Sequence, residues 1–299
     1  MSVQLAVAPI AWSNSDLPQL GGDTPLETCL RESREAGFTG TESGAKYPMD
    51  PEKLGPLLKQ FDLKLASGWF SGTLRECSVD EEWENLQEML YTFKSLQAPV
   101  LVYAETSGSV QTKQQIPVSQ RPVMPDEEYP EYGRKLTEIA DRMAAYGVPM
   151  VYHHHMGTVI EKEREVDLLM ANTGPNVNLL IDTGHLTFAG GNVEATTRRH
   201  GHRLKHVHCK DIRADVYKRV QAEDMSFLDA VLEGVFTVPG DGSIDFHNFA
   251  KVLSDINYSG WIVVEAEQDP EKANPLIYSR MGHQHLTDAL QKAAIEIQA

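Results

Sequence analysis

The sequence predicts a single (β/α)8 TIM barrel over residues 1–299, because eight short apolar strands alternate with helical segments along the chain. Barrels of this class usually contain about 250 residues plus insertions. The strands are rich in Val, Ile and Leu without sustained polar alternation, which is typical of a parallel sheet buried on both faces. A doubly wound sheet is disfavoured, because residues 8–12 after the first strand do not form a glycine-rich phosphate turn.

The elements follow one another in the order that a barrel requires. The expected strands span residues 3–9, 38–42, 64–70, 99–104, 149–153, 177–182, 204–208 and 261–265. The first helix is expected to have Thr24 as its N-cap, Pro25 in its first turn and Glu27 in a capping box, and to end at Gly37. Further helices are expected at 81–96, 131–146, 161–171, 193–200 and 246–256. Two stretches, 106–126 and 212–234, are interpreted as active-site loop insertions.

Composition excludes several classes of partner. The 27 basic and 43 acidic residues give a net charge of −16, which argues against binding to nucleic acid or to anionic membranes. The substrate is therefore expected to be small, and neutral unless a metal supplies positive charge. We expect a cytoplasmic protein with reduced thiols, because the chain has three scattered cysteines, no basic and apolar leader and no membrane-length apolar run. A homo-oligomer is left open.

Potential metal ligands gather at the ends of the last four expected strands. His153, Asp182, His208 and Glu265 end strands five to eight, and neighbouring strands of a barrel place their ends on one side of its mouth. Nitrogen and oxygen donors of this kind suit a divalent cation such as Mn²⁺, Co²⁺ or Zn²⁺. Taken singly, each residue also has a structural interpretation: Asp182 as a helix cap, Glu265 as the partner of a basic residue.

Other polar and aromatic residues are expected near the same mouth. They are Trp12, Asn14, Glu42, Trp69, Glu105, Lys210 and Arg213. The two tryptophans either pack at the rim or form a stacking wall for the apolar face of a sugar ring. Asn14 is at least as well explained as a turn residue. Glu42 needs a partner, because an unpaired buried carboxylate is costly.

Several motifs resemble a known superfamily. The runs "TGTESG", "IDTGH", "HVHCKD" and "GWIVVEAEQDP" resemble the xylose-isomerase-like barrels, and they occur in the right order. Within that superfamily, "APIAWSNSDLPQLGG", "VYHHHMGT" and "VPGDGSIDF" resemble the inosose dehydratases of inositol catabolism. The resemblance covers essentially the whole chain. It implies a lyase that dehydrates 2-keto-myo-inositol (scyllo-inosose) to a trihydroxycyclohexane-dione.

The resemblance also implies the ligands and cofactors. Asp182, His208 and Glu265 match three metal ligands of the superfamily. The fourth ligand is usually a Glu at the end of strand five, where this chain has His153, with His155 as the alternative. The implied cofactors are a divalent metal, Mn²⁺ or Co²⁺, and glutathione. His185 matches a residue that contacts substrate in sugar-epimerising relatives.

The chemistry expected of such a site is proton abstraction next to a ketone, followed by loss of a β-hydroxyl. Glu267, Glu42 and His185 are the acid and base candidates, and the sequence does not rank them. Substrate contacts are expected from the mouth residues named above, Lys210 and Arg213 among them. A sugar 3-epimerase or a ketose–aldose isomerase is the main alternative; a non-catalytic sugar-binding barrel and an abasic-site nuclease rank below it.

Overall fold

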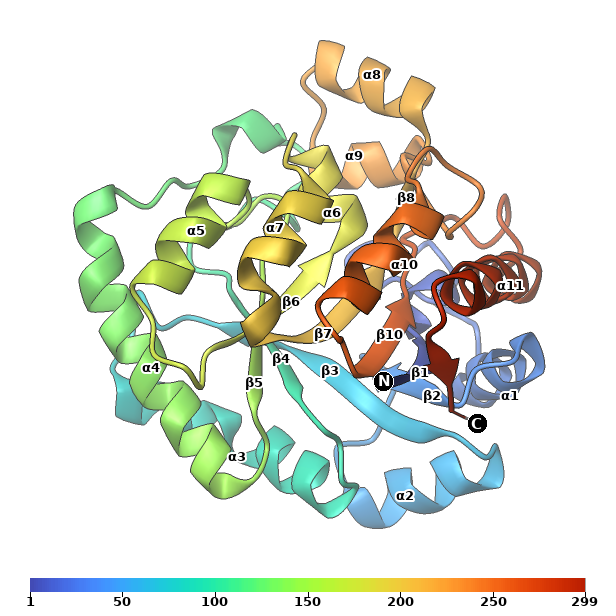
Figure 1. Cartoon of the computed structure of the whole chain (residues 1–299), viewed down its shortest axis with the longest axis horizontal. Coiled ribbons are helices and arrows are strands. Elements are labelled where there is room, and N and C mark those ends of the chain that lie inside the picture. Colours follow the sequence, from blue (N-terminus) through green and yellow to red (C-terminus); the bar gives the residue numbers. More distant parts are fainter. Residues whose placement is uncertain (299) are drawn as a thin grey trace.

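Eight parallel strands form a closed barrel in the computed structural model, which describes residues 1–298 (Figure 1). The strands pair in chain order, and β10 pairs with β1 to close the sheet. Their bounds are β1 Ser2–Val7, β2 Gly40–Ser43, β3 Lys64–Gly72, β4 Leu101–Glu105, β5 Met150–His153, β6 Asn178–Asp182, β7 Leu204–Cys209 and β10 Gly260–Val264. The predicted barrel and all eight of its strands are confirmed. A short strand, β11 (Glu296–Ile297), extends the sheet beside the start of β1.

Part of the barrel interior is filled by side chains from β10, β1, β2 and β3. Trp261 of β10 lies against Gly40 of β2, where a Cβ atom would come within 2.4 Å of the indole ring. Ala6 of β1 and Ala66 of β3 leave further room around the same ring. One large aromatic side chain therefore fills this part of the lumen because its neighbours are small, as close packing requires.

Helices cover the outside of the barrel (Figure 1). They are α1 Leu26–Ala36, α2 Pro51–Gln60, α3 Val79–Ser95, α4 Tyr129–Tyr146, α5 Glu163–Ala171, α6 Thr183–Phe188, α7 Val193–His200, α10 Phe246–Asp255 and α11 Pro275–Lys292. Sequence analysis did not predict α2, α6 or α11. Gly55 and Pro56 interrupt the helical pattern of α2, and Gly282 interrupts that of α11. No helix in the described part of the chain is long and apolar enough to cross a membrane.

The first helix begins differently from the prediction. Pro25 is its N-cap, no side chain caps the helix, and the capping box of Thr24 and Glu27 is absent from the described structure. Pro25 instead accepts the first helical hydrogen bonds through its carbonyl oxygen, from the backbone N–H groups of Thr28 and Cys29. Gly37 ends the helix in the left-handed conformation, as predicted.

The two stretches interpreted as insertions lie beside each other. Residues 106–126 carry two short 3-10 turns, Val118–Gln120 and Asp126–Glu128. Residues 212–234 contain α8 Ala214–Ala222 and α9 Phe227–Leu232, which project beyond the strand ends, flanked by the antiparallel strands β8 Asp211–Ile212 and β9 Phe236–Thr237 (Figure 1). The Val118 N–H donates to the Met225 carbonyl, and the Ser119 hydroxyl donates to Asp224. These contacts join the two segments.

A buried ion network anchors the first of these segments to the loop after β5. Arg121 lies 3.2 Å from Glu161 and 2.5 Å from Glu165, and it also donates to the Thr158 carbonyl. One guanidinium thus faces two carboxylates, and all three side chains are buried. Burial is the main cause that raises the pKa of Glu161 to about 7, although Arg121 opposes the shift.

This shift predicts that stability falls as pH rises. Between pH 4.5 and about 7, Glu161 is protonated in the folded protein but ionised in the unfolded chain. The stability that this bound proton contributes is therefore fully present below pH 4.5 and is lost as the pH rises to about 7. Between pH 5 and pH 8, the free energy of unfolding of wild type should fall relative to that of Glu161→Gln by up to about 3 kcal/mol. Denaturant unfolding at a series of pH values measures the difference. If the free energies of unfolding of the two proteins changed in parallel with pH, the raised pKa of Glu161 would be contradicted.

Candidate metal centre

A cavity of about 480 Å³ opens at the carboxyl ends of the barrel strands. Its floor carries charged and imidazole side chains from β2, β5, β7 and the segment after β10, and its walls are more apolar. The residues on the floor are Glu42, His153, His155, His208, Glu265 and Glu267. Ligands of parallel-barrel proteins bind at this end of the fold.

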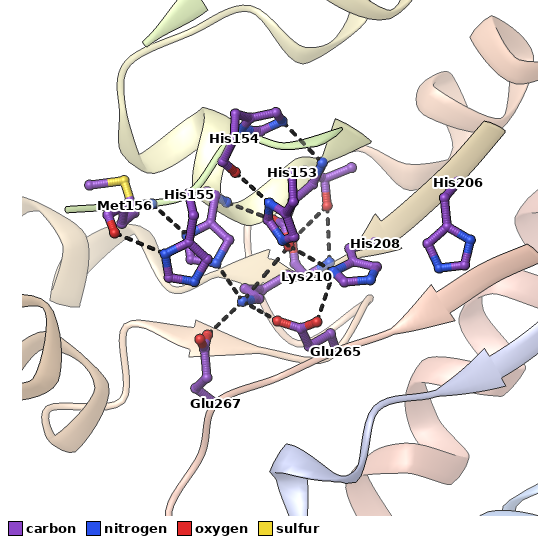
Figure 2. A network of polar contacts seen from close by, with 12 residues as sticks. His153, His154, His155, Met156, His206, His208, Lys210, Glu265 and Glu267 are labelled. Carbon is purple, nitrogen blue, oxygen red and sulfur yellow. Dashed lines mark hydrogen bonds and ion pairs between the residues drawn. The ribbon is translucent and has the colours of Figure 1, made fainter. Parts of the chain in front are cut away.

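Four predicted ligands converge on one point of the floor. Oδ2 of Asp182 lies 3.9 Å from Nε2 of His153 and 3.6 Å from Nδ1 of His208. Oε2 of Glu265 lies 2.8 Å from the same Nδ1 atom (Figure 2). Asp182 Oδ2 is buried and has no hydrogen-bond partner in the described residues. A buried carboxylate oxygen facing two imidazoles fits a divalent cation.

Hydrogen bonds distinguish the three consecutive histidines. Nδ1 of His153 donates to its neighbour's carbonyl oxygen at 2.6 Å, so Nε2 keeps a lone pair that faces Asp182. Nε2 of His154 accepts from the Asp182 backbone N–H, and its ring points away from the cluster (Figure 2). Nδ1 of His155 donates to the Met156 carbonyl oxygen at 2.8 Å. Among the three, His153 is the one that joins Asp182 and His208 in a single group of donors.

Asp182 combines the two roles that sequence analysis weighed against each other. Oδ1 caps α6 by accepting from the His185 backbone N–H at 2.7 Å, while Oδ2 faces the cluster. The cap fixes the rotamer of the carboxylate, because one oxygen is held at the start of the helix.

Glu42 lies on the other side of His208. Oε1 of Glu42 accepts from Nε2 of His208 at 2.9 Å, which leaves Nδ1 to face the cluster. The same oxygen accepts from the Ser67 hydroxyl and lies 3.1 Å from His206. Burial opposes ionisation of Glu42, but these two histidines outweigh it and hold its pKa below the ordinary range. A carboxylate in this position orients a metal-binding imidazole. Glu42 was predicted as an acid or base; it lines the cavity, and its contact with His208 also suits a positioning role.

Lys210 is the remaining charge in the cluster, and it has no exposed side-chain surface. Its Nζ atom lies 2.7 Å from Glu265 and 2.6 Å from Glu267, so it does not line the cavity as predicted for a substrate contact. Burial disfavours the ammonium, but these carboxylates outweigh burial and raise the pKa of Lys210. For Glu267 burial dominates and raises the pKa to about 7, with Lys210 opposing.

His185 also lies below the cavity. Its Nε2 atom is 2.9 Å from Nζ of Lys210, and its ring packs against that of His155 with a centroid distance of 3.9 Å. Burial is the main cause that lowers the pKa of His185, and Lys210 adds to it. The ring is therefore a neutral hydrogen-bond acceptor for the lysine rather than part of the cavity wall.

Of the two tryptophans, only Trp69 lines the cavity. Its ring contacts His153 and His155 edge to face, at centroid distances of 5.5 and 5.2 Å. Trp12 is buried away from the cavity and donates to Glu32 at 2.7 Å. The pairing was not visible in the sequence, because Trp12 and Glu32 lie in different segments.

Three further predicted substrate contacts lie outside the cavity lining. Asn14 accepts backbone hydrogen bonds within its own turn, from residues 16 and 17. Glu105 is buried and accepts from the backbone N–H groups of Arg75 and Ser107. Arg213 pairs with Asp241 at 2.7 Å. Each of these side chains stabilises a loop around the mouth.

Sequence analysis did not assign some residues that do line the cavity. Gln111 and Thr112 come from the segment 106–126, and Tyr47 and Met49 come from the loop after β2. The position of 106–126 beyond a strand end was the available signal for the first pair. His155 lines the cavity as well, although it was weighed only as an alternative ligand.

The sequence model of the xylose isomerase-like TIM barrel family matches residues 30–288. The chain belongs to this family. Solved structures of the family's fold superimpose on it, among them the IolI protein with a bound zinc atom, at a TM-score of 0.68. That pair is 19% identical and covers 97% of this chain and 99% of the other.

Closer relatives within this xylose isomerase-like family share most of the sequence length. The rhizopine catabolism protein MocC of Rhizobium meliloti is 51% identical over 96% of this chain and 88% of its own length. The inosose dehydratase of Clostridium tetani is 42% identical over 98% of both chains. The resemblance to inosose dehydratases that the motifs indicated is confirmed.

The contact between Glu42 and His208 yields a prediction. Glu42→Gln keeps the size of the side chain but loses the charge that holds the His208 ring, so Mn²⁺ affinity should fall roughly 10- to 100-fold. Isothermal titration of the chelator-treated protein measures this change. Glu105→Gln is the matched control, since it removes a buried carboxylate elsewhere and should leave the Kd for Mn²⁺ unchanged. A wild-type Kd in Glu42→Gln would rule out the positioning role.

Proposed function

We propose that the protein is a metal-dependent hydro-lyase that dehydrates 2-keto-myo-inositol to a trihydroxycyclohexane-dione. The observation that carries the proposal is the group formed by His153, Asp182 and His208, with Glu265 lying 2.8 Å from His208. Three of these residues line a cavity, in a chain 42% identical to an inosose dehydratase over nearly its full length. The relative named MocC supports a role in the catabolism of small molecules.

The four converging residues are proposed to hold one divalent cation. Neutral imidazoles and ionised carboxylates are the forms that bind metal. Burial, with neighbouring His208 adding to it, keeps the pKa of His153 low, while Lys210 and His208 outweigh burial and keep that of Glu265 low. Burial also disfavours the charged form of His208, but Glu42 and Glu265 outweigh it and raise the pKa of His208, so binding of a cation at Nδ1 is coupled to loss of a proton. A divalent ion bound here supplies a Lewis acid that stabilises negative charge on the oxygen of a substrate ketone. A solved structure of the same fold, that of the IolI protein, contains a bound zinc atom, which supports a metal ion in a barrel of this kind.

The reaction needs one group to remove a proton and one to protonate the leaving oxygen. The C–H bond next to the ketone breaks first, and its electron pair forms the enolate. The C–O bond of the β-hydroxyl then breaks, a proton joins that oxygen, and water leaves. Tautomerisation of the resulting enol gives the dione. We assign Glu267 to proton transfer, because it lines the cavity beside Glu265 while Lys210 holds its Oε2 atom.

The walls suit a small cyclic polyol. Trp69 presents an aromatic surface to the cavity, and such surfaces stack on the C–H faces of sugar-like rings. Gln111 and Thr112 supply neutral hydrogen-bonding groups on the side formed by segment 106–126. Neutral polar groups over an aromatic wall favour an uncharged polyhydroxylated ring.

Cofactors and location complete the proposal. We propose Mn²⁺ or Co²⁺ as the native ion, because histidine and carboxylate donors suit both. Glutathione is proposed as a second requirement on the strength of the family resemblance alone. A cytoplasmic location is proposed too, and the free thiols of Cys29, Cys77 and Cys209 support it.

The decisive experiment incubates Mn²⁺-loaded protein with scyllo-inosose. We expect a product lighter by one water, with new ultraviolet absorbance from its conjugated enol form. His208→Ala and Asp182→Asn should each lose bound metal and turnover while circular dichroism shows a folded barrel, because each removes one donor. His202→Ala changes an exposed histidine and serves as the matched control with unchanged activity.

Each outcome of this experiment has a distinct meaning. An epimer of unchanged mass would replace the dehydratase proposal with an epimerase. Full metal content and activity in His208→Ala would discard the ligand assignment. Parallel assays with Mn²⁺, Co²⁺ and Zn²⁺, each with and without glutathione, test the proposed cofactors.

Variants of two neighbouring carboxylates, Glu265 and Glu267, distinguish metal binding from proton transfer. Glu267→Gln should keep one metal ion per chain but lower kcat by roughly 10²- to 10⁴-fold, since it removes only the proton-transfer group. Glu265→Gln should lose the ion. Metal analysis and steady-state kinetics measure both effects. Wild-type kcat in Glu267→Gln would exclude its assignment to proton transfer.

A further inference from the structure

The side chain of Lys210 is an internal cation surrounded by the chain itself. Besides its contacts with Glu265 and Glu267, Nζ lies 2.9 Å from Nε2 of His185 and 3.8 Å from Oδ2 of Asp182. The ring of Phe236 closes another side, with its centroid 4.9 Å from Nζ. Figure 2 shows the ammonium of Lys210 between Glu265 and Glu267.

Two consecutive residues at the start of α6, Thr183 and Gly184, position this lysine. The Thr183 hydroxyl donates to the Lys210 carbonyl oxygen at 2.7 Å and accepts from the Lys210 N–H at 3.0 Å. The next residue, Gly184, leaves space for the lysine stem, because a Cβ atom there would lie 2.6 Å from Cγ of Lys210. The start of α6 and the end of β7 thus fit around one aliphatic chain.

The ammonium of Lys210 lies beside a second group of side chains that could bind a metal ion. His155, His185 and Glu267 each offer a ligand atom, and these atoms lie within 4.8 Å of one another. This group adjoins the four proposed ligands in two ways. Glu267 follows Glu265 on the same segment, and His185 also offers a ligand atom to a group with Asp182 and Glu265. Nζ of Lys210 is within hydrogen-bond distance of two members of the group, His185 and Glu267.

We propose that Lys210 is a fixed cation that takes the place of a second metal ion and limits the centre to one divalent ion per chain. This rests on the proposed ion at His153, Asp182, His208 and Glu265. Lys210 holds Oε1 of Glu265, and Oε2 of Glu265 faces His208. The lysine is therefore a positioning residue: it orients a metal ligand and satisfies Glu267 without a second ion.

The test counts ions in chelator-treated protein titrated with Mn²⁺. Wild type should saturate at one Mn²⁺ per chain and give the six-line paramagnetic resonance spectrum of an isolated ion. Lys210→Met removes the ammonium but keeps a chain of similar length, so His155, His185 and Glu267 become available. This variant should take up a second Mn²⁺, and its spectrum should broaden through coupling between the two ions. Lys210→Arg, which retains the charge, should remain at one.

Opposite results overturn the proposal in recognisable ways. Two ions in wild type, or one ion of unchanged affinity in folded Lys210→Met, would contradict the role of Lys210 and leave the proposed reaction intact. Absence of any bound Mn²⁺ in wild type would contradict the metal centre itself and this inference with it. If Lys210→Met fails to fold, the counts for wild type and Lys210→Arg decide, since two ions in either refute the proposal.

Discussion

The pairing of β10 with β1 is the constraint on which the rest of the molecule depends. Once the sheet is closed and all its strands run the same way, every strand must end at one rim. Donors that are distant in the sequence, such as Glu42 and His208, then meet at that rim. An open sheet would spread the same side chains along an edge, and no four of them would share a point.

Closure also brings opposite strands into contact across the lumen. Ser67 on β3 lies 2.9 Å from His206 on β7, and Glu42 on β2 touches both. This polar contact adjoins the apolar cluster of Trp261 and its small neighbours, because Trp261 is paired with His206 in the sheet. His206 therefore contacts the carboxylate that holds the ring of His208.

The sequence was sufficient to predict what depends on local pattern. Short apolar runs alternating with helical segments located the eight strands, and the polar residues at the ends of the last four predicted His153, Asp182, His208 and Glu265 as a group. Pattern alone did not separate His153 from His155, because their difference lies in which carbonyl oxygen each Nδ1 reaches. Nor did it show that Trp12 and Arg213 have partners within the protein, Glu32 and Asp241. Such pairings depend on tertiary structure.

The close packing of Gly184 against Lys210 couples the substitutions that evolution can accept at these two positions. A larger residue at 184 would collide with the lysine stem, while a short residue at 210 would leave a buried gap beside the glycine. A residue larger than glycine at 184 can therefore be accepted only if the side chain at 210 changes or moves as well. Covariation between these two sites should accordingly mark the branches of the family in which the built-in charge was gained or given up.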